Sequence, residues 1–108
     1  MAVFTPGKML KIYFAEAHRW QGRPLAELLV ERALAAGIAG ATVLPGVGGF
    51  GHHHKLHTTK LLELSHDLPR VVELVDSAKK IDAFITAQQE ILDGTTLVLL
   101  DVEMRAAV

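Results

Sequence analysis

The stretch LPRVVELVD, residues 68–76, carries the strongest strand signal in the sequence, because it is short, rich in valine and bounded by polar residues. Directly after it, Asp76 or Ser77 stands where a helix N-cap belongs. Apolar residues at helical spacing follow at Ile81, Phe84, Ile85, Ile91 and Leu92. Gly94 ends this pattern, and TTLVLLDVE, residues 95–103, returns to strand character. Together these segments predict a strand–helix–strand unit.

The first part of the chain predicts a strand followed by a helix. KMLKIYFAE, residues 8–16, alternates with a period of two, which places one set of side chains on each face of a strand. Leu10, Ile12 and Phe14 share one face, and Lys11 and Tyr13 share the other. The period then changes to that of a helix over residues 24–36, with proline at its first position and glycine directly after its last.

A second strand is predicted at residues 41–44, directly before Pro45 and a glycine-rich run. Proline lacks the N–H group that a neighbouring strand needs. We therefore expect this strand to lie at the edge of the sheet, or to carry a bulge near Pro45.

Two consecutive strand–helix–strand units predict an α+β, ferredoxin-like βαββαβ sandwich. Its four-stranded antiparallel sheet has both helices on one face and the second and fourth strands at its edges. The fourth strand is apolar on both faces, which a sheet covered on one side does not require. We interpret this excess as contact between subunits. The alternative is that a terminal segment covers the face.

Composition limits the classes of function. The 108 residues fit one domain, residues 1–108, and the net charge of −1 gives no basic face for nucleic acid. The absence of cysteine excludes disulfides, thiolate chemistry and cysteine-based zinc sites. The N-terminus lacks a signal-peptide pattern, and the longest apolar runs, about five residues, are far below the roughly 20 that span a bilayer. We expect a cytoplasmic protein.

The glycine-rich run GVGGFG, residues 46–51, is a candidate anion site. Gly46, Gly48, Gly49 and Gly51 can adopt positive φ, which lets backbone amides approach an anion closely. A bulge or a loop hinge explains the same glycines equally well.

Next comes the histidine-rich run HHHKLH, residues 52–57. Neutral imidazoles bind Zn²⁺, Ni²⁺ or Cu²⁺, so His52, His53, His54 and His57 are candidate metal ligands. His52 and His54 share a face of an extended chain, and His53 and His57 share a face of a helix; either pair is half of a tetrahedral set. A trimer could bring more ligands together around its axis. The other interpretations are incidental metal affinity and an ordinary solvated loop.

No constellation predicts catalysis. Ser65, His66 and Asp67 are consecutive, so they cannot form a nucleophile–base–orienter chain, and Asp67 is interpreted as a turn residue. Glu16 and His18 form either an acid–base pair or a surface pair. Arg19 and Trp20 either stack on a base or cover the end of the sheet. We expect a binding protein, not an enzyme.

The longer stretch GATVLPGVGGFG, residues 40–51, resembles the second strand and loop entry of PII signalling proteins. The matching residues are Gly40, Thr42, Val43, Gly49, Phe50 and Gly51. Together with IYFAE, His57-Thr58, LSHDLPRVVELVD and LVLLDVE, the stretch is closer still to an uncharacterised PII-like bacterial and archaeal family. That family is the domain of unknown function one-ninety in the PII/CutA-like superfamily, and the resemblance covers residues 9–103.

This resemblance implies a homotrimer that binds adenine nucleotides in clefts between subunits. It places the candidate ligand site at Thr42, Gly46, Gly48, Gly49, Phe50, Gly51 and Arg105. The connection over about residues 52–67 corresponds to the T-loop, with which PII relatives contact partners such as channels and enzymes. Members of the family are frequently encoded beside fluoride-channel-type genes, so a membrane channel or transporter is a candidate partner.

The chain departs from the PII pattern at its basic residues. His52 replaces an arginine, Thr95 replaces a phosphate-binding lysine, and Arg105 is the remaining late basic residue. These changes favour a smaller or less charged ligand, or AMP over ATP. The principal hypothesis is a PII-like trimeric regulator that binds an adenine nucleotide. The alternative is a trimer that binds or senses a divalent metal through the loop histidines.

Overall fold

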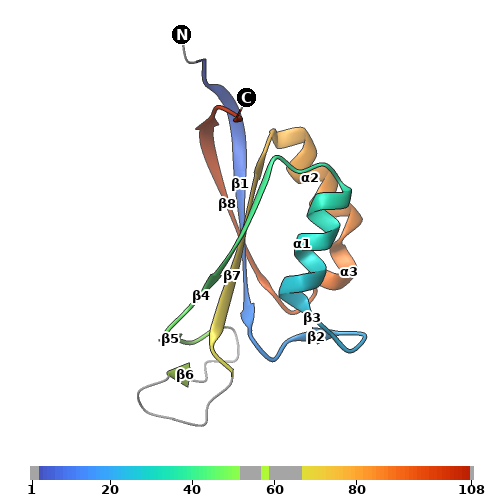
Figure 1. The fold of residues 1–108 in the computed structure, drawn as a ribbon, viewed down its shortest axis with the longest axis vertical. Coiled ribbons are helices and arrows are strands. Elements are labelled where there is room, and N and C mark those ends of the chain that lie inside the picture. The colour runs from blue at the N-terminus through green and yellow to red at the C-terminus, as the bar shows by residue number, and fades with distance from the viewer. Residues whose placement is uncertain (1–2, 52–56, 59–66, 108) are drawn as a thin grey trace.

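The computed structural model describes residues 3–51, 57–58 and 67–107. These residues form a four-stranded antiparallel sheet with its helices on one face (Figure 1). In the order in which they pair, its strands are β4 (Gly40–Pro45), β7 (Pro69–Asp76), β1 (Thr5–Ala15) and β8 (Thr96–Met104). The helices are α1 (Leu25–Ala35), α2 (Ala78–Ala87) and α3 (Gln89–Leu92). Two short pairs complete the fold: β2 (Arg19–Trp20) with β3 (Arg23–Pro24), and β5 (Gly48–Gly49) with β6 (His57–Thr58).

The predicted ferredoxin-like α+β fold is confirmed. The second and fourth long strands, β4 and β8, are the edges of the sheet, and Pro45 is the last residue of β4. The second predicted helix is divided, because the backbone leaves helical geometry at Gln88, with φ −107° and ψ 18°. The side chain of Gln88 accepts a hydrogen bond from Nη1 of Arg32 at 2.8 Å, which ties this break to α1.

The core lies between the helices and one face of the sheet. Leu10 and Ile12 of β1 and Val72 and Leu74 of β7 are 0 % exposed, as the alternation in β1 predicts. Phe14 of β1 is also buried, and the helices contribute the remaining buried side chains, namely Leu25, Leu28, Leu29, Ala33, Ile81, Phe84, Ile91 and Leu92. We call the opposite side of the sheet the open face.

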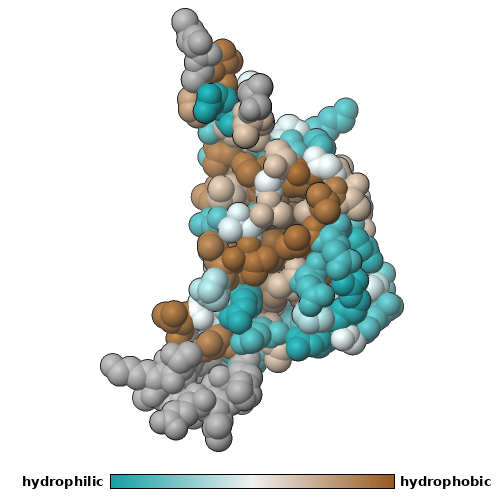
Figure 2. All heavy atoms as spheres, viewed as in Figure 1, coloured by the Kyte–Doolittle hydropathy of each residue, from teal (hydrophilic) through white to brown (hydrophobic). Residues whose placement is uncertain are grey.

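The strand β8 is apolar on both faces and exposed on both. Leu97 and Leu99 face the helix side, and Val98 and Leu100 belong to the open face; all four are 37–47 % exposed. The helices leave them uncovered because α1 packs over β4 and β7, and α2 over β1 and β7. Figure 2 shows apolar residues gathered along the sheet, whereas hydrophilic residues gather over the outer side where α1 begins. The described terminal residues, 3–4 and 105–107, are themselves exposed.

The carboxylate of Asp76 links the turn that precedes β4 to the turn that precedes α2. Asp76, at the end of β7, accepts hydrogen bonds from the backbone N–H of Ser77 at 2.6 Å and of Ala39 at 2.8 Å. Its Oδ2 also lies 3.5 Å from Nζ of Lys80, which donates to the carbonyl of Gly37. Of the two candidate caps, Ser77 is the N-cap of α2, with its side chain accepting from the N–H of Lys80. Asp76 thus holds the turn before β4 against the start of α2.

Within the described part of the chain, no helix is both long and apolar enough to cross a membrane.

We expect Asp76→Asn to lower the free energy of unfolding by about 1–3 kcal/mol near neutral pH, because two backbone N–H donors lose a charged acceptor. Partial burial alone raises the pKa of Asp76, but the N–H groups of Ser77 and Ala39, with Lys80, outweigh it and hold the pKa below its ordinary value of 3.8. A carboxylate whose pKa is lowered by folding stabilises the folded state at pH values above its ordinary pKa. This contribution is lost as the pH falls through the folded-state pKa. The difference between wild type and variant should therefore shrink below pH 3.8.

Urea unfolding at several pH values and a fixed protein concentration measures this difference. Asp101→Asn is the matched control, because the Asp101 side chain is 88 % exposed and pairs with Lys8 at the surface. An Asp76 variant as stable as wild type near neutral pH would contradict this role.

Candidate ligand site

The predicted ligand residues from Gly46 to Gly51 lie at one end of the sheet, where β4 and β1 end and β7 and β8 begin (Figure 1). The strand register brings this end together, since Arg70 pairs with Pro45 on one side and with Phe14 on the other. The connection over residues 52–67 leaves and re-enters the sheet at the same end. The glycine run therefore begins at the end of the sheet where β1 ends and β7 begins.

Gly46 is required for a close backbone contact. Its N–H donates to the carbonyl of Pro69 at 2.8 Å. A Cβ at this position would lie 3.0 Å from the Cβ of Pro69 and 3.1 Å from the Pro69 carbonyl oxygen. Because its N–H is already bonded within the chain, the anion-binding role predicted for the glycine amides is left to the glycines that follow.

Those glycines turn the chain into a short hairpin. Gly48 and Gly49 form β5 and pair with Thr58 and His57 of β6. Gly49 has φ +139°, a backbone region that glycine adopts without strain. Phe50 follows and is 66 % exposed, and a Cβ at Gly51 would meet no atom of the described residues within 4 Å apart from its chain neighbours. The structure thus presents the 48–51 segment as an accessible turn beside the end of β4.

The other two predicted ligand residues lie elsewhere. Thr42 is an exposed residue of β4 that pairs with Glu73 on the open face of the sheet. Arg105 follows β8, whose last residue, Met104, pairs with Thr5 at the opposite end of β1. Within one chain, Arg105 and the glycine run are therefore at opposite ends of the sheet.

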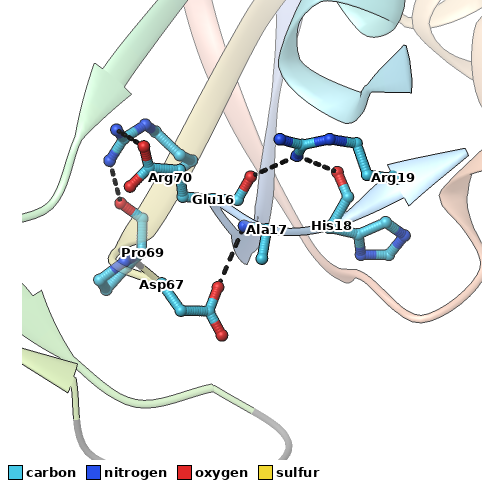
Figure 3. Close-up of polar contacts among 7 residues, drawn as sticks. All are labelled: Glu16, Ala17, His18, Arg19, Asp67, Pro69 and Arg70. Carbon is cyan, nitrogen blue, oxygen red and sulfur yellow. Dashed lines mark hydrogen bonds and ion pairs between the residues drawn. The ribbon is translucent and has the colours of Figure 1, made fainter. Parts of the chain in front are cut away.

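A guanidinium group that the sequence reasoning missed lies at the glycine end. Nη1 of Arg70 donates to the carbonyl of Pro69 at 3.2 Å, and Nη2 lies 3.2 Å from Oε1 of Glu16 (Figure 3). The Pro69 carbonyl thus accepts from both Arg70 and Gly46. The Arg70 side chain is 22 % exposed, which is low for an arginine at a strand end. The guanidinium of Arg70 and the first glycine of the run, Gly46, are therefore held by the same carbonyl oxygen.

Backbone and carboxylate contacts hold the surroundings of Arg70 in place. Asp67, just before β7, accepts from the N–H of Ala17 at 3.0 Å, and the N–H of Glu16 donates to the carbonyl of Leu68 at 2.8 Å. On the far side of Glu16, Nη1 of Arg19 donates to the Glu16 carbonyl at 2.9 Å (Figure 3). These bonds clamp the end of β1 to the start of β7 at the foot of the 52–67 connection.

These contacts bear on two pairs of residues that the sequence singled out. The carboxylate of Glu16 pairs with Arg70, whereas the ring of His18 lies edge-on to Phe14 with centroids 6.3 Å apart. Trp20 packs against the core, and the guanidinium carbon of Arg32 lies 5.8 Å from its ring centroid. Trp20 therefore covers the end of the sheet.

The predicted metal ligands lie largely outside the described residues. His52, His53 and His54 fall there, as do Ser65 and His66, and His57 is described by its backbone pairing in β6. Among the described residues, no group of three or more His, Cys, Asp or Glu side chains could hold a metal ion. The histidine site stays a prediction.

Comparison with known sequences finds a family profile that spans nearly the whole chain. The profile of DUF190, described as "Uncharacterized ACR, COG1993", matches residues 7–104. A UPF0166 protein of Aquifex aeolicus (strain VF5) is 37 % identical over 78 residues, which cover 72 % of this chain and 74 % of the relative. UPF0166 protein MJ1524 of Methanocaldococcus jannaschii is 28 % identical over 93 residues, covering 86 % and 85 %.

Among solved structures, the chain is similar to CPII from Thiomonas intermedia K12, a nitrogen regulatory PII-like protein. The apo form of CPII aligns with a TM-score of 0.66 and 14 % identity, over 99 % of this chain and 100 % of that one. A form bound to ADP, AMP and bicarbonate aligns with a TM-score of 0.65 and 17 % identity, over 98 % and 92 %. At these identities the likeness establishes a shared PII-like fold.

We predict that Gly46→Ala lowers the free energy of unfolding by about 1–3 kcal/mol, because the new methyl group overpacks against Pro69. It should also speed hydrogen exchange of the amide at position 46, whose bond to the Pro69 carbonyl is strained or lost. Gly51→Ala is the control from the same run, and it should change stability by less than about 0.5 kcal/mol. Equal stabilities for the two variants, measured by urea unfolding, would show that the close contact is unimportant.

Proposed function

The chain belongs to the DUF190 family, and from this premise we propose that it is a PII-like regulatory protein of the cytoplasm. It assembles as a homotrimer, binds an adenine nucleotide in the clefts between subunits, and acts by binding rather than by catalysis. Contact with a partner, for which a membrane channel or transporter is the candidate, is assigned to the connection over residues 52–67.

The observation that carries the proposal is the position of Arg70. Its guanidinium and the N–H of Gly46 share the Pro69 carbonyl, so a fixed positive charge stands beside the start of the glycine run, where Phe50 is exposed. A guanidinium binds phosphate oxygens in the same fork geometry in which it binds a carboxylate. Arg70 can therefore supply the charge that Thr95 does not carry.

Glu16 is the intramolecular competitor in this proposal. Its carboxylate now occupies Nη2 of Arg70, at 3.2 Å. An incoming phosphate takes that place at the guanidinium and leaves the Glu16 carboxylate to solvent, since the Glu16 side chain is already 40 % exposed. The exchange favours a ligand with few phosphates, because Arg70 supplies only one guanidinium group and the negative carboxylate of Glu16 remains nearby.

Two further observations support the nucleotide and the trimer. CPII, which shares the fold, is described in complex with ADP and AMP. The exposed apolar residues of β8 and of the open face provide the surface that a trimer would bury. Within its own subunit, Arg105 lies at the opposite end of the sheet from the glycine run. A contact from Arg105 to the ligand must therefore come from a neighbouring subunit.

Calorimetric titration with AMP, ADP and ATP tests this function. We expect saturable binding to wild type, and a 10- to 100-fold weaker affinity for Arg70→Gln, which corresponds to the about 1.5–3 kcal/mol of a hydrogen bond to a charged group. Glu16→Gln should bind as tightly as wild type or several-fold more tightly, because the competing carboxylate is gone. An Arg105→Gln variant measures the contribution of the neighbouring subunit.

Arg23→Gln is the matched control, because that guanidinium pairs with Glu27 and Glu31 at the surface of α1. No heat with any of the three nucleotides would refute nucleotide binding. Wild-type affinity in Arg70→Gln would refute the assignment of Arg70 while leaving the function in place.

A further inference from the structure

One row of residues that pair across the open face is polar from the edge strand β4 to the central strand β1. Thr42 of β4 pairs with Glu73 of β7, Glu73 pairs with Lys11 of β1, and Lys11 pairs with Val98 of β8. Residues that pair directly across an antiparallel sheet point to the same face. We call the row formed by Thr42, Glu73, Lys11 and Val98 the polar rung.

The levels on either side of the polar rung contain no charged residue. One consists of Leu44, Val71, Tyr13 and Thr96, and the other of Gly40, Val75, Met9 and Leu100. Tyr13, Leu44, Val98 and Leu100 are 37–41 % exposed, so this apolar surface is uncovered in the single chain. It continues around the edge of the sheet to Leu97 and Leu99 on the other side of β8.

The charges of the polar rung are paired and partly covered by their neighbours. Nζ of Lys11 lies 3.4 Å from Oε2 of Glu73, and their side chains are 29 % and 24 % exposed. Lys8 and Asp101 form an ion pair on the other face of β1 and β8, and there the Asp101 side chain is 88 % exposed. Lys11 and Glu73 thus stand nearly side by side in the middle of an apolar surface.

In the homotrimer of the proposed function, where further copies of this chain cover the open face, we propose that the Lys11–Glu73 pair fixes the register of that packing. The proposal rests on the homotrimer of the proposed function and adds the residues that make its interface specific. Two properties identify the occupant as a copy of the chain. The apolar surface wraps around β8 onto both faces, and the rung carries one charge of each sign, so it is complementary to itself.

Charged residues are needed to fix the register because the burial of apolar surface is non-directional. An apolar sheet face alone can be covered in several relative positions at similar free energy. Covering an ion pair is costly when either charge is left unpaired, so a shifted arrangement that separates Lys11 from an opposite charge is disfavoured. In a rotationally symmetric assembly, Lys11 of one subunit can approach Glu73 of the next, and the same contact repeats at every interface. The ion pair contributes specificity more than affinity.

Native mass spectrometry and light scattering over a range of protein concentrations test this role in the full chain, with circular dichroism to check folding. Wild type should give one stoichiometry. Lys11→Met and Glu73→Leu, taken singly, each leave one unpaired charge and should weaken association at least tenfold. The apolar double variant Lys11→Met/Glu73→Leu should associate as strongly as wild type but with mixed stoichiometries. The charge-swapped double variant Lys11→Glu/Glu73→Lys should restore the single stoichiometry.

The matched control is Lys8→Gln/Asp101→Asn, which removes the ion pair on the other face and should assemble like wild type. Single variants that assemble like wild type would overturn the proposal, as would an apolar double variant with the single wild-type stoichiometry. If a single variant does not fold, the two double variants decide. A monomeric wild type at all concentrations would refute the trimer itself, which is a separate result from a trimer that ignores Lys11 and Glu73.

Discussion

The antiparallel pairing of β1 with β7 is the constraint on which the other features of this protein depend. Its register sets Leu10 beside Leu74 and Ile12 beside Val72, which places four fully buried side chains under the helices. The same register sets Lys11 beside Glu73 on the open face, and it ends by bringing Ala15 to Pro69. Since side chains alternate, a slip by one residue would turn the core set to solvent and move the charges into the core. The core, the proposed interface and the candidate ligand site thus all depend on this one strand pairing.

The end of β4 shows how one edge strand serves the ligand site. Pro45 has no N–H group, so no further strand can pair there through its nitrogen, and the edge position tolerates it. Directly afterwards, Gly46 turns its N–H to the Pro69 carbonyl, an approach that a Cβ would obstruct at 3.0 Å. Pro45 ends the strand ladder and Gly46 brings the chain against Pro69 of β7, so the turn at residues 48–51 begins directly after the carbonyl that Gly46 and Arg70 share.

Much of the fold could be predicted from the sequence because it depends on residue patterns that span only a few positions. The alternation around Ile12, the proline at position 45 and the cap at Asp76 or Ser77 each act over a few residues. The structure confirms the buried face of β1 and selects the edge position for β4 and Ser77 as the cap. The candidate site was harder, because its contacts join segments that are far apart in the chain. Nothing near Arg70 in the sequence reveals Glu16, and the pair is visible only once the β1–β7 register is known. Likewise, the separation of Arg105 from the glycine run follows from the direction of β8, which a motif does not encode.

The ligand site and the proposed interface share the strand β4. Thr42 belongs to the polar rung, and Gly46 follows the end of the same strand, with β7 paired alongside throughout. A hydrogen-bonded strand pair is a stiff connection, so the position of the rung against a neighbouring subunit fixes the position of the glycine run against that neighbour. The bonds from Asp67 to Ala17 and from Leu68 to Glu16 tie the start of β7 to the end of β1 at this same point. The Glu16–Arg70 ion pair lies where three strands meet, at the foot of the 52–67 connection, so the phosphate exchange that we propose there would bear on both the proposed cleft and the connection.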